Sequence, residues 1–342
     1  MRIWKPKMNV LNADINGEYT VISLFAGCGG SSLGYKMAGY KELLAIDFNK
    51  NAIETFKLNF PEVPIWQRDI SKIKGKEILN FCNIKKGDLD VLDGSPPCQG
   101  FSTAGKRKVM DLRNDLVNEY IRLISEIEPK VFIMENVSGM VKGKMKGLFI
   151  EYVKRMKELN YNVKVKLLNA KYYNIPQSRQ RLIFIGIRKD LKKKPVFPIA
   201  NKKLITVKEV LKDINNKRWE LDSAEKVKDT WIGEELKILR EGEQSKKHFS
   251  LIRAAKNKPC PCIQKCHGDA GTAGLCHFSE DRRFTISELK RLSSFPDTFK
   301  FVGSFKIQWA QIGNSVPPLF MKAISETVRK EILEKIVNYG AN

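Results

Sequence analysis

The chain has 342 residues, of which 42% are hydrophobic, and 61 lysines and arginines against 38 aspartates and glutamates give a net charge of +23. Its apolar runs are far too short to cross a bilayer and its first ten residues lack the apolar core of a signal peptide, so we expect a soluble, intracellular protein with no membrane partner. The basic surplus favours a polyanion such as nucleic acid, although a lysine-rich composition also follows from an AT-rich genome. Seven cysteines, an odd number, argue against a disulfide framework and fit a reducing compartment.

The first part of the chain alternates strand and helix signals. Residues 21–25 are predicted as a buried strand, and residues 26–30 form a glycine-rich loop that leads into a helix. A second strand at 43–47 precedes a helix that Asn49 caps and Pro61 ends. Strand, glycine loop, helix and a strand with a terminal acid are the opening of a doubly wound α/β sheet.

Later segments extend this pattern and then depart from it. The sequence predicts strands at 63–66, 131–134, 162–168 and 182–187 and helices at 114–128 and 319–337. Between residues 190 and 280 the periodicity weakens, and lysines and glycines become frequent. We therefore expect a main α/β domain of residues 1–190 and 307–342, a smaller domain at 191–282 and a hinge at 283–306.

The glycine-rich loop is a candidate cofactor site. Its glycines let the backbone approach a ligand closely, and Asp47 is spaced to accept hydrogen bonds from ribose hydroxyls. The dinucleotide fingerprint is incomplete, because its third glycine falls at Ser32. A nucleoside without phosphates, such as S-adenosylmethionine, therefore fits better than a pyrophosphate, and Asp69 and Ile70 are candidates for its adenine edge. Ordinary loop acids are the alternative for the two aspartates.

A rigid turn at residues 95–100 follows the predicted strand at 89–93 and carries Cys98. Two consecutive prolines fix the φ angles just before the thiol. A thiol at the carboxyl end of a strand in an α/β sheet lies where such folds bind ligands, so we predict that Cys98 is a nucleophile. The alternative is a small buried hydrophobic residue at a strand end.

Six short motifs occur in a fixed order along the chain. They are the loop at 25–30, the turn at 96–102, Glu135 with Asn136 and Val137, Gln177 with Arg179 and Arg181, the segment 283–297, and the segment 311–317. In type and order they resemble the motifs of the DNA cytosine-C5 methyltransferases, over most of the chain outside 190–280. Related families that methylate exocyclic amines carry an aromatic residue at the position of Cys98, so the cysteine points to chemistry at a ring carbon.

The resemblance implies a Rossmann-like fold and methyl transfer from S-adenosylmethionine to carbon 5 of cytosine. That carbon is too weakly nucleophilic on its own, and addition of the Cys98 thiolate at carbon 6 makes it enamine-like. Glu135 is implied to hold the ring nitrogen and the exocyclic amine, Arg181 to bind the base carbonyl, and Arg179 to orient the pocket. Base flipping is implied because the ring is unreachable inside a duplex. A salt bridge with an arginine is the alternative for Glu135.

The same resemblance supplies a wider set of expected contacts. The residues expected to hold the cofactor are Phe25, Ala26, Gly27, Gly29, Gly30, Asp47, Phe48, Asp69, Ile70, Pro97, Asn314, Ser315 and Val316. The residues expected to contact DNA are Gln99, Ser102, Lys106, Arg107, Lys108 and Gln177. The three consecutive basic residues lie in a segment, 100–114, that looks like the loop closing over the flipped base, where they would grip phosphates.

Residues 191–282 correspond to the target-recognition domain of the family. Where members often carry Pro-Thr-Ile this chain has Cys262 between Pro261 and Ile263, so a contact from a threonine hydroxyl is not carried over. The region also holds Cys260, Cys262, Cys266, His267, Cys276 and His277. Their spacings lack the paired C-x2-C pattern of structural zinc sites, so we predict no metal.

Several alternatives stay open from the sequence. One branch of the family methylates cytosine in transfer RNA, although the long variable domain favours double-stranded DNA. A catalytically silent DNA-binding regulator is disfavoured by the complete set of catalytic residues, and an NAD-dependent dehydrogenase by the missing third glycine. By analogy we expect a monomeric, cytoplasmic, prokaryotic enzyme on nucleoid DNA, the modification half of a restriction system with a separate cognate endonuclease.

Overall fold

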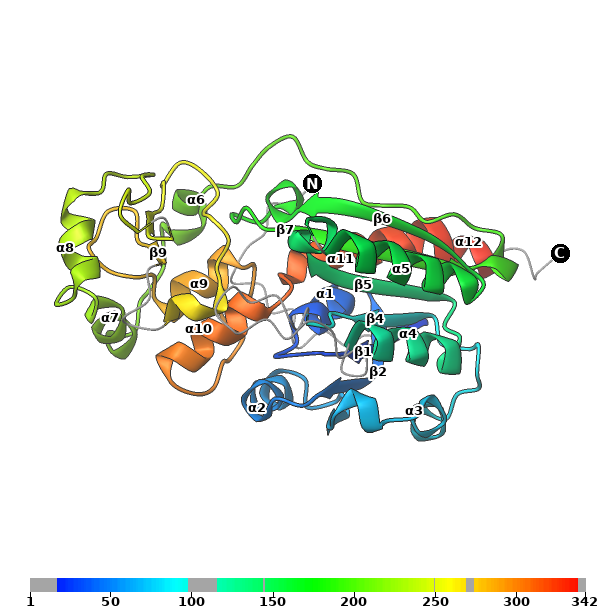
Figure 1. Cartoon of the computed structure of the whole chain (residues 1–342). Coiled ribbons are helices and arrows are strands. Elements are labelled where there is room, and N and C mark those ends of the chain that lie inside the picture. Colours follow the sequence, from blue (N-terminus) through cyan, green and yellow to red (C-terminus); the bar gives the residue numbers. More distant parts are fainter. Residues whose placement is uncertain (1–16, 98–115, 144, 249, 269–273, 338–342) are drawn as a thin grey trace.

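The computed structural model describes residues 17–97, 116–143, 145–248, 250–268 and 274–337, which form two units of different construction (Figure 1). The larger unit is built on a seven-stranded sheet with the order β3-β2-β1-β4-β5-β7-β6. Its strands are β1 (Tyr19–Leu24), β2 (Tyr40–Asp47), β3 (Ile65–Gln67), β4 (Val91–Gly94), β5 (Val131–Val137), β6 (Tyr161–Asn169) and β7 (Gln180–Arg188). Strands β1 to β5 are parallel, and β7 is antiparallel to both β5 and β6.

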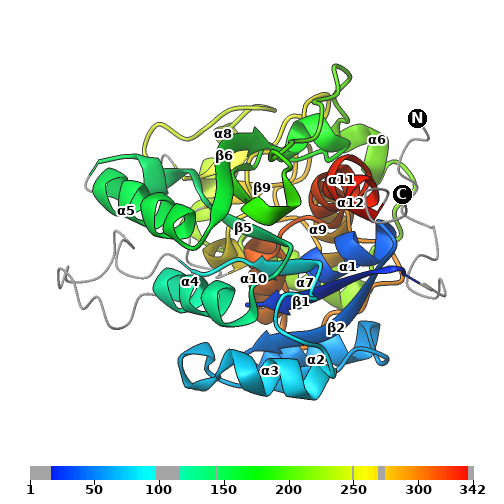
Figure 2. The same ribbon diagram turned by 90° about the vertical axis from the view of Figure 1, so that its right-hand side faces the viewer.

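Helices cover both faces of this sheet, which is why its central strands are apolar on both sides (Figure 2). The helices are α1 (Gly30–Met37), α2 (Lys50–Asn59), α3 (Gly75–Cys82), α4 (Leu116–Ile127), α5 (Met145–Glu158), α11 (Pro318–Val328) and α12 (Glu334–Val337). One apolar core lies under α3, α4 and α5, and a second lies under α1 and α11. A π-helical turn, Arg329–Leu333, joins α11 to α12. The carboxyl ends of β1 to β5 meet at one edge, the position of ligand sites in such folds.

The smaller unit has short elements around a core of its own. They are α6 (Val207–Leu211), α7 (Arg218–Glu225), α8 (Trp231–Ile238), β8 (Ile252–Arg253), β9 (Leu275–Cys276), α9 (Ile286–Leu292) and α10 (Phe305–Asn314). Its core joins residues of α6 to α9 and to Trp309 and Ile312 of α10. The sequence-based boundaries, with a hinge at 283–306 and residues 307–342 in the main domain, stay a prediction. Helix α9 belongs to the core of the smaller unit, residues 295–302 after it pack against α2 of the large unit, and α11 packs on α1.

Most predicted elements of the large unit are found within a few residues. Asn49 caps α2 as expected, its side chain accepting a hydrogen bond from the amide of Ala52. The third strand occurs at Ile65–Gln67 rather than 63–66, and α7 and α8 were missed because they lie in the stretch of weak periodicity. In the part of the chain that the structure describes, no helix is long and apolar enough to cross a membrane.

Candidate active site

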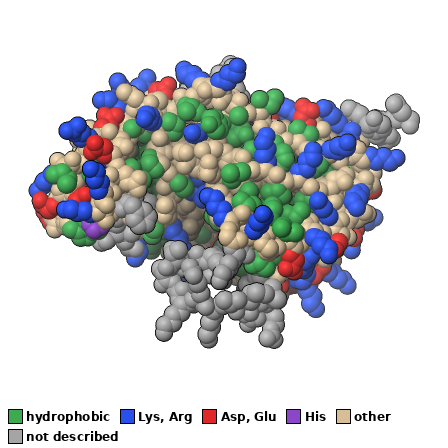
Figure 3. All heavy atoms as spheres, turned by 45° about the horizontal axis from the view of Figure 1, so that its top comes forward, with side chains coloured by type: hydrophobic (Ala, Val, Ile, Leu, Met, Phe, Trp, Pro, Cys, Tyr) green, Lys and Arg blue, Asp and Glu red, His purple; other side chains and the backbone are tan. Residues whose placement is uncertain are grey.

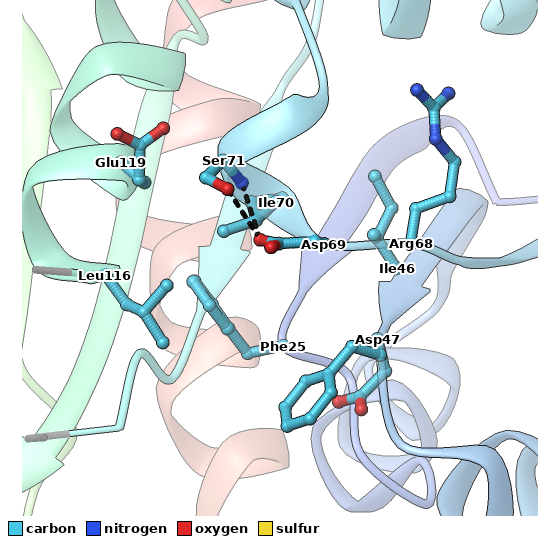
Figure 4. Close-up of a pocket in the computed structure, with 10 residues that line it drawn as sticks. Phe25, Ile46, Asp47, Arg68, Asp69, Ile70, Ser71, Leu116 and Glu119 are labelled. Atoms are coloured by element: carbon cyan, nitrogen blue, oxygen red, sulfur yellow. Dashed lines mark hydrogen bonds between the residues drawn. The ribbon is translucent and has the colours of Figure 1, made fainter. Parts of the chain in front are cut away.

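A cavity of about 300 Å³ opens at the carboxyl ends of β1, β2 and β3 (Figure 4). Five of the predicted cofactor residues line it, namely Phe25, Asp47, Phe48, Asp69 and Ile70. Five further lining residues were missed by the sequence analysis, namely Ile46, Arg68, Ser71, Leu116 and Glu119. Leu116 and Glu119 come from α4, and only tertiary packing brings that helix to the cavity.

Asp47 fixes the shape of the glycine loop. Its carboxylate accepts a hydrogen bond from the amide of Gly27 at 2.8 Å and another from the amide of Asn49 at 2.8 Å. Burial raises the pKa of Asp47. Phe25, at the start of the loop, has a φ of 59°, a backbone conformation that costs energy in a non-glycine residue and is concentrated at functional sites. The aspartate therefore holds the loop as well as facing the cavity.

Ser315 and Val316, near the end of the chain, pack against the glycine loop. A Cβ atom on Gly30 would lie 2.3 Å from the carbonyl oxygen of Val316, so glycine is required there for close packing. The Cys28 sulfur lies 2.9 Å from the hydroxyl oxygen of Ser315. Burial raises the pKa of Cys28 to about 12, which keeps this thiol protonated and unreactive at neutral pH. Ser315 and Val316 thus brace the loop, and they are not among the residues that line the cavity.

The lining of the cavity suits a nucleoside without phosphates. Phe48 presents an apolar ring that is 65% exposed, next to the carboxylates of Asp47 and Asp69. Hydrogen bonds from the amide and hydroxyl of Ser71 hold the pKa of Asp69 below its usual range. Arg68 is the one basic side chain among the ten lining residues, and it is paired with Glu77 at 2.9 Å. Carboxylate acceptors beside an apolar wall match ribose hydroxyls and a purine better than a pyrophosphate.

The predicted acid stands next to the predicted nucleophile turn. Gly94 of β4 is paired with Met134 of β5, so residues 95–97, the described part of the turn, follow β4 beside Glu135. The side-chain amide of Asn136 donates a 3.0 Å hydrogen bond to the carbonyl of Pro96. Tyr120 of α4, which the sequence analysis missed, has its hydroxyl 2.9 Å from the carbonyl oxygen of Leu92 and 3.0 Å from that of Ile133. These contacts tie the ends of the two strands together.

Glu135 is 7% exposed and lies against Arg181 of the antiparallel strand β7. The Arg181 Nε atom is 2.7 Å from Oε1 of Glu135. The two groups are not aligned for a hydrogen bond, so Oε1 is buried with no hydrogen-bond partner among the described residues. A buried polar atom without a partner costs free energy, so a ligand that donates a hydrogen bond there is favoured. The salt bridge that was the alternative for Glu135 is therefore present.

Arg179 and Gln177 lie in the junction between the two units and are both buried. Arg179 donates hydrogen bonds to the carbonyls of Ile263 and Gly313, at 3.3 and 2.9 Å. Burial, with the charge of Arg181 nearby, lowers the pKa of Arg179 to about 10.

Gln177, which is predicted to contact DNA, is buried inside the protein. Its amide nitrogen donates to the hydroxyl of Ser293 at 3.1 Å, and its amide oxygen accepts from the amide of Ile263 at 3.3 Å. Both ends of the side chain are used inside the protein, and the residue is 1% exposed. These contacts join the two units, and the DNA contact of Gln177 stays a prediction.

Part of the predicted site lies outside the described residues. This part comprises Cys98, Gln99, Ser102, Lys106, Arg107 and Lys108. Pro97 is the last described residue before them, and it is exposed. Among the described residues, no group of three or more histidine, cysteine, aspartate or glutamate side chains could hold a metal ion. Burial raises the pKa of Cys260 and that of Cys276.

Comparison with known proteins identifies the family. The model of the C-5 cytosine-specific DNA methylases matches residues 19–330. This chain belongs to that family. It is 33% identical over 330 residues to the type II methyltransferase M1.HphI of Haemophilus parahaemolyticus, covering 91% of this chain and 87% of that protein. It is 32% identical over 363 residues to the type II methyltransferase M.XorII of Xanthomonas oryzae, covering 92% and 85% of the two chains.

A solved structure shows the same fold. A prophage-encoded protein from E. coli, provisionally named a DNA modification methyltransferase, superposes with a TM-score of 0.74 at 27% identity, over 94% of this chain and 100% of that one. The α/β fold predicted from the sequence is confirmed, and the enzyme is a DNA cytosine-C5 methyltransferase that uses S-adenosylmethionine. The cavity described above is the place in this chain whose residues fit that cofactor.

Proposed function

We propose that this methyltransferase modifies one cytosine within a specific double-stranded sequence, as the modification enzyme of a type II restriction system. The observation that carries the site assignment is the buried Oε1 atom of Glu135, which is held beside the nucleophile turn and lacks a hydrogen-bond partner among the described residues. The names of the relatives, all type II methyltransferases, support the restriction role. A separate endonuclease, a monomeric state and a location with nucleoid DNA in a prokaryotic cytoplasm belong to this proposal.

The proposed chemistry divides among three groups of this chain. The Cys98 thiolate adds to carbon 6 of the flipped cytosine, which makes carbon 5 nucleophilic. Glu135 holds the ring nitrogen and the amine, so that the charge that develops on the ring is drawn away from carbon 6. Arg181, 2.7 Å from Glu135, orients the carboxylate and faces the base carbonyl. After methyl transfer, loss of the proton on carbon 5 lets the thiolate leave and restores the aromatic ring.

The proposed cofactor residues fall into two groups. Asp47, Phe48, Asp69 and Ile70 line the cavity and would hold the ribose and the adenine. Gly30, Ser315 and Val316 keep the loop in place by close packing. S-adenosylmethionine, when bound, supplies the electrophilic methyl group on its sulfonium sulfur.

The proposed DNA contacts come from two parts of the chain. In the segment after Cys98, Lys106, Arg107 and Lys108 would bind phosphates, and the smaller unit would read the sequence. Arg179 and Gln177 join the smaller unit to the sheet at the base of this site. The position of both residues fits a role in setting the relative placement of the target base and the recognition surface.

The test is a methyl-transfer assay with labelled S-adenosylmethionine on double-stranded genomic DNA and on transfer RNA. We expect label in DNA alone, and bisulfite sequencing of the product should place it on one cytosine of one short sequence. Label in transfer RNA alone would reject the proposed substrate.

The covalent step is tested with DNA that carries 5-fluorocytosine in the recognised sequence. The fluorine cannot leave as a proton does, so the wild-type enzyme should form an adduct that resists denaturation. The Cys98→Ser variant should form none while still retaining DNA and cofactor binding. An adduct of equal yield in that variant would reject Cys98 as the nucleophile.

A further inference from the structure

The stretch from residue 161 to residue 208 is almost free of acids. It contains ten lysines and three arginines but a single acid, Asp190. This imbalance is much stronger than that of the whole chain, where 61 basic residues are opposed by 38 acidic ones. A composition bias of the genome would raise lysine everywhere, so it does not account for a local loss of acids.

The three arginines of this stretch and Asp190 contact one another or other residues of the protein. Arg188 donates two hydrogen bonds to Asp190, at 2.9 and 3.1 Å. Arg179 is buried in the junction between the units, and Arg181 contacts Glu135. The exposed positive charge of the stretch is therefore carried by lysines, and its one acid is matched by an arginine.

These lysines come together along one edge of the sheet. Strand β6 is the edge strand, and the connection that leaves β7 runs beside it toward α6 (Figure 1). The side chain of Asn162 donates to the carbonyl of Lys193 at 3.2 Å, and the ammonium of Lys166 lies 5.9 Å from the ring centre of Phe197. Further along, the amide of Asn201 donates to the carbonyl of Tyr172 at 2.8 Å. We define the edge track as the exposed lysines of β6 and this connection, namely Lys164, Lys166, Lys189, Lys192, Lys194, Lys202 and Lys203.

Glu209 of α6 lies close enough to Lys203 to interact with its charge, whereas two other acids on helices beside the edge track are paired elsewhere. Glu158 of α5 pairs with Lys154 of its own helix, and on the other side Glu334 of α12 pairs with Arg329. In Figure 3, which brings the top of Figure 1 forward, lysine and arginine side chains are spread over this face and acidic ones are far fewer. A local excess of positive charge attracts a polyanion, which releases its condensed counterions when it binds.

The track begins at the active site and leads away from it. Leu168, near the end of β6, pairs with Arg181, the residue that contacts Glu135. From Leu168 back to Tyr161, β6 extends about 23 Å, at about 3.3 Å per residue. DNA held there would lie outside the candidate active site at Glu135 but within reach of it.

We propose that the edge track binds the phosphate backbone of a second stretch of the same DNA, without reading its sequence, while the enzyme searches for its target cytosine. The inference rests on the proposed DNA substrate and adds to it a second contact surface. Lysine ammonium groups suit this role because they act as point charges on phosphate and carry no base specificity. The surface would keep the enzyme on a long DNA molecule between encounters with its target.

The binding test compares two variants with the same loss of charge. The track variant carries Lys164→Gln, Lys166→Gln, Lys192→Gln and Lys194→Gln. The control carries Lys50→Gln, Lys57→Gln, Lys76→Gln and Lys85→Gln, at exposed positions around α2 and α3, near the opposite edge of the sheet. Affinity for a 200-base-pair duplex of arbitrary sequence is measured from 50 to 200 mM salt. We expect the slope of log affinity against log salt to fall by about 1 for each lysine lost in the track variant and much less in the control.

The functional test uses one DNA preparation, intact or cut to fragments of about 20 base pairs, with the same methyl-transfer assay. The track variant should methylate fragments within twofold of the wild-type rate and intact DNA several-fold more slowly, and the control should match the wild type on both. Salt slopes and rates on intact DNA that are equal in the two variants would overturn the inference. If the wild-type protein transfers no methyl group but the track variant and the control still differ in salt slope, the proposed function is rejected and the edge track stays supported.

Discussion

The two units of this enzyme are stabilised in different ways. The large unit has apolar cores on both faces of its sheet, with strand residues such as Phe132 and Ile133 fully buried. The smaller unit has two strands of two residues each and buries several arginines. There Arg282 donates to both carboxylate oxygens of Glu288 at 2.9 Å, and Arg291 donates to both oxygens of Asp297 at 2.9 and 2.7 Å.

These two kinds of construction suit different tasks. A parallel sheet between two helix layers holds strand ends in fixed positions, which suits a nucleophile, an acid and a cofactor loop. A unit held by local ion pairs and short elements needs no long repeating pattern, so its surface can vary while its frame is kept. In the function proposed above, the large unit carries the reaction and the smaller unit reads the DNA sequence.

The largest expected effect lies in the large unit and distinguishes two of its cysteines. Cys98→Ala should lower the rate of methyl transfer by roughly 10⁴-fold or more, because no other group replaces the nucleophile. Cys28→Ala should keep the rate within a few-fold, since its thiol is buried and protonated. Single-turnover methyl transfer measures both, with circular dichroism as a control for folding. Similar losses in the two variants would show that the glycine loop, and not the thiol chemistry, limits the reaction.

The next effect tests the frame of the smaller unit. Arg282→Met leaves the buried carboxylate of Glu288 without its main partner and should lower the free energy of unfolding by about 3–5 kcal/mol. Adding Glu288→Leu should recover part of the loss, because the uncompensated charge is removed. Urea unfolding measures both variants. A single variant as stable as the wild type would show that the smaller unit is held mainly by its apolar core.

A pH effect of intermediate size is expected from His277 of the smaller unit. Its Nδ1 atom accepts hydrogen bonds from the amides of Ser279 and Glu280, which requires the neutral ring. Burial, together with nearby Arg282 and Arg253 and against the attraction of Glu288 and Glu280, lowers the pKa of His277 from 6.5 to about 4. The unfolded chain therefore binds a proton that the folded chain does not between pH 6.5 and about 4, and stability falls as the pH falls through that window.

The measurement is the free energy of unfolding at pH 7 and pH 5, with His277→Gln as the matched variant. The variant should lose less stability than the wild type on acidification, since its side chain does not titrate. Equal losses would assign the pH dependence to other groups.

The smallest expected effect is the loss of a helix N-cap, which should cost the same stability in both units. Asn49 caps α2 in the large unit, and Thr206 caps α6 in the smaller one, each accepting a backbone amide hydrogen bond. Replacing either residue by alanine should cost about 1 kcal/mol in thermal or urea unfolding. A clearly larger cost at Thr206 would mean that the smaller unit depends on its helix caps as well as on its buried ion pairs.

The sequence was sufficient where a local pattern repeats. The strand before the glycine loop, the cap at Asn49 and the helix predicted at 114–128 are found at Tyr19–Leu24, at α2 and at Leu116–Ile127. The residues at strand ends, Asp47 and Asp69, were identified because a parallel sheet collects the carboxyl ends of its strands at one edge. The smaller unit was not resolved into elements, because helices such as α7 and α8 have eight residues each, too few for a clear repeat, and the small apolar cluster under α8 includes Leu251 and Cys276 from distant parts of the chain.

The sequence alone determined the chemical groups of the site and the order in which they occur, since a glycine loop, a Pro-Pro-Cys turn and a lone acid after a strand are local features. The tertiary structure decided their partners. Strand β7 runs antiparallel to β5, which sets Arg181 against Glu135, and the same folding turns Gln177 inward to join the two units. It also decided that α4 lines the cavity at the ends of β1, β2 and β3 and that β6 stands at an edge with the lysine-rich connection beside it. These outcomes depend on pairing and packing between segments distant in the chain, which no local pattern contains.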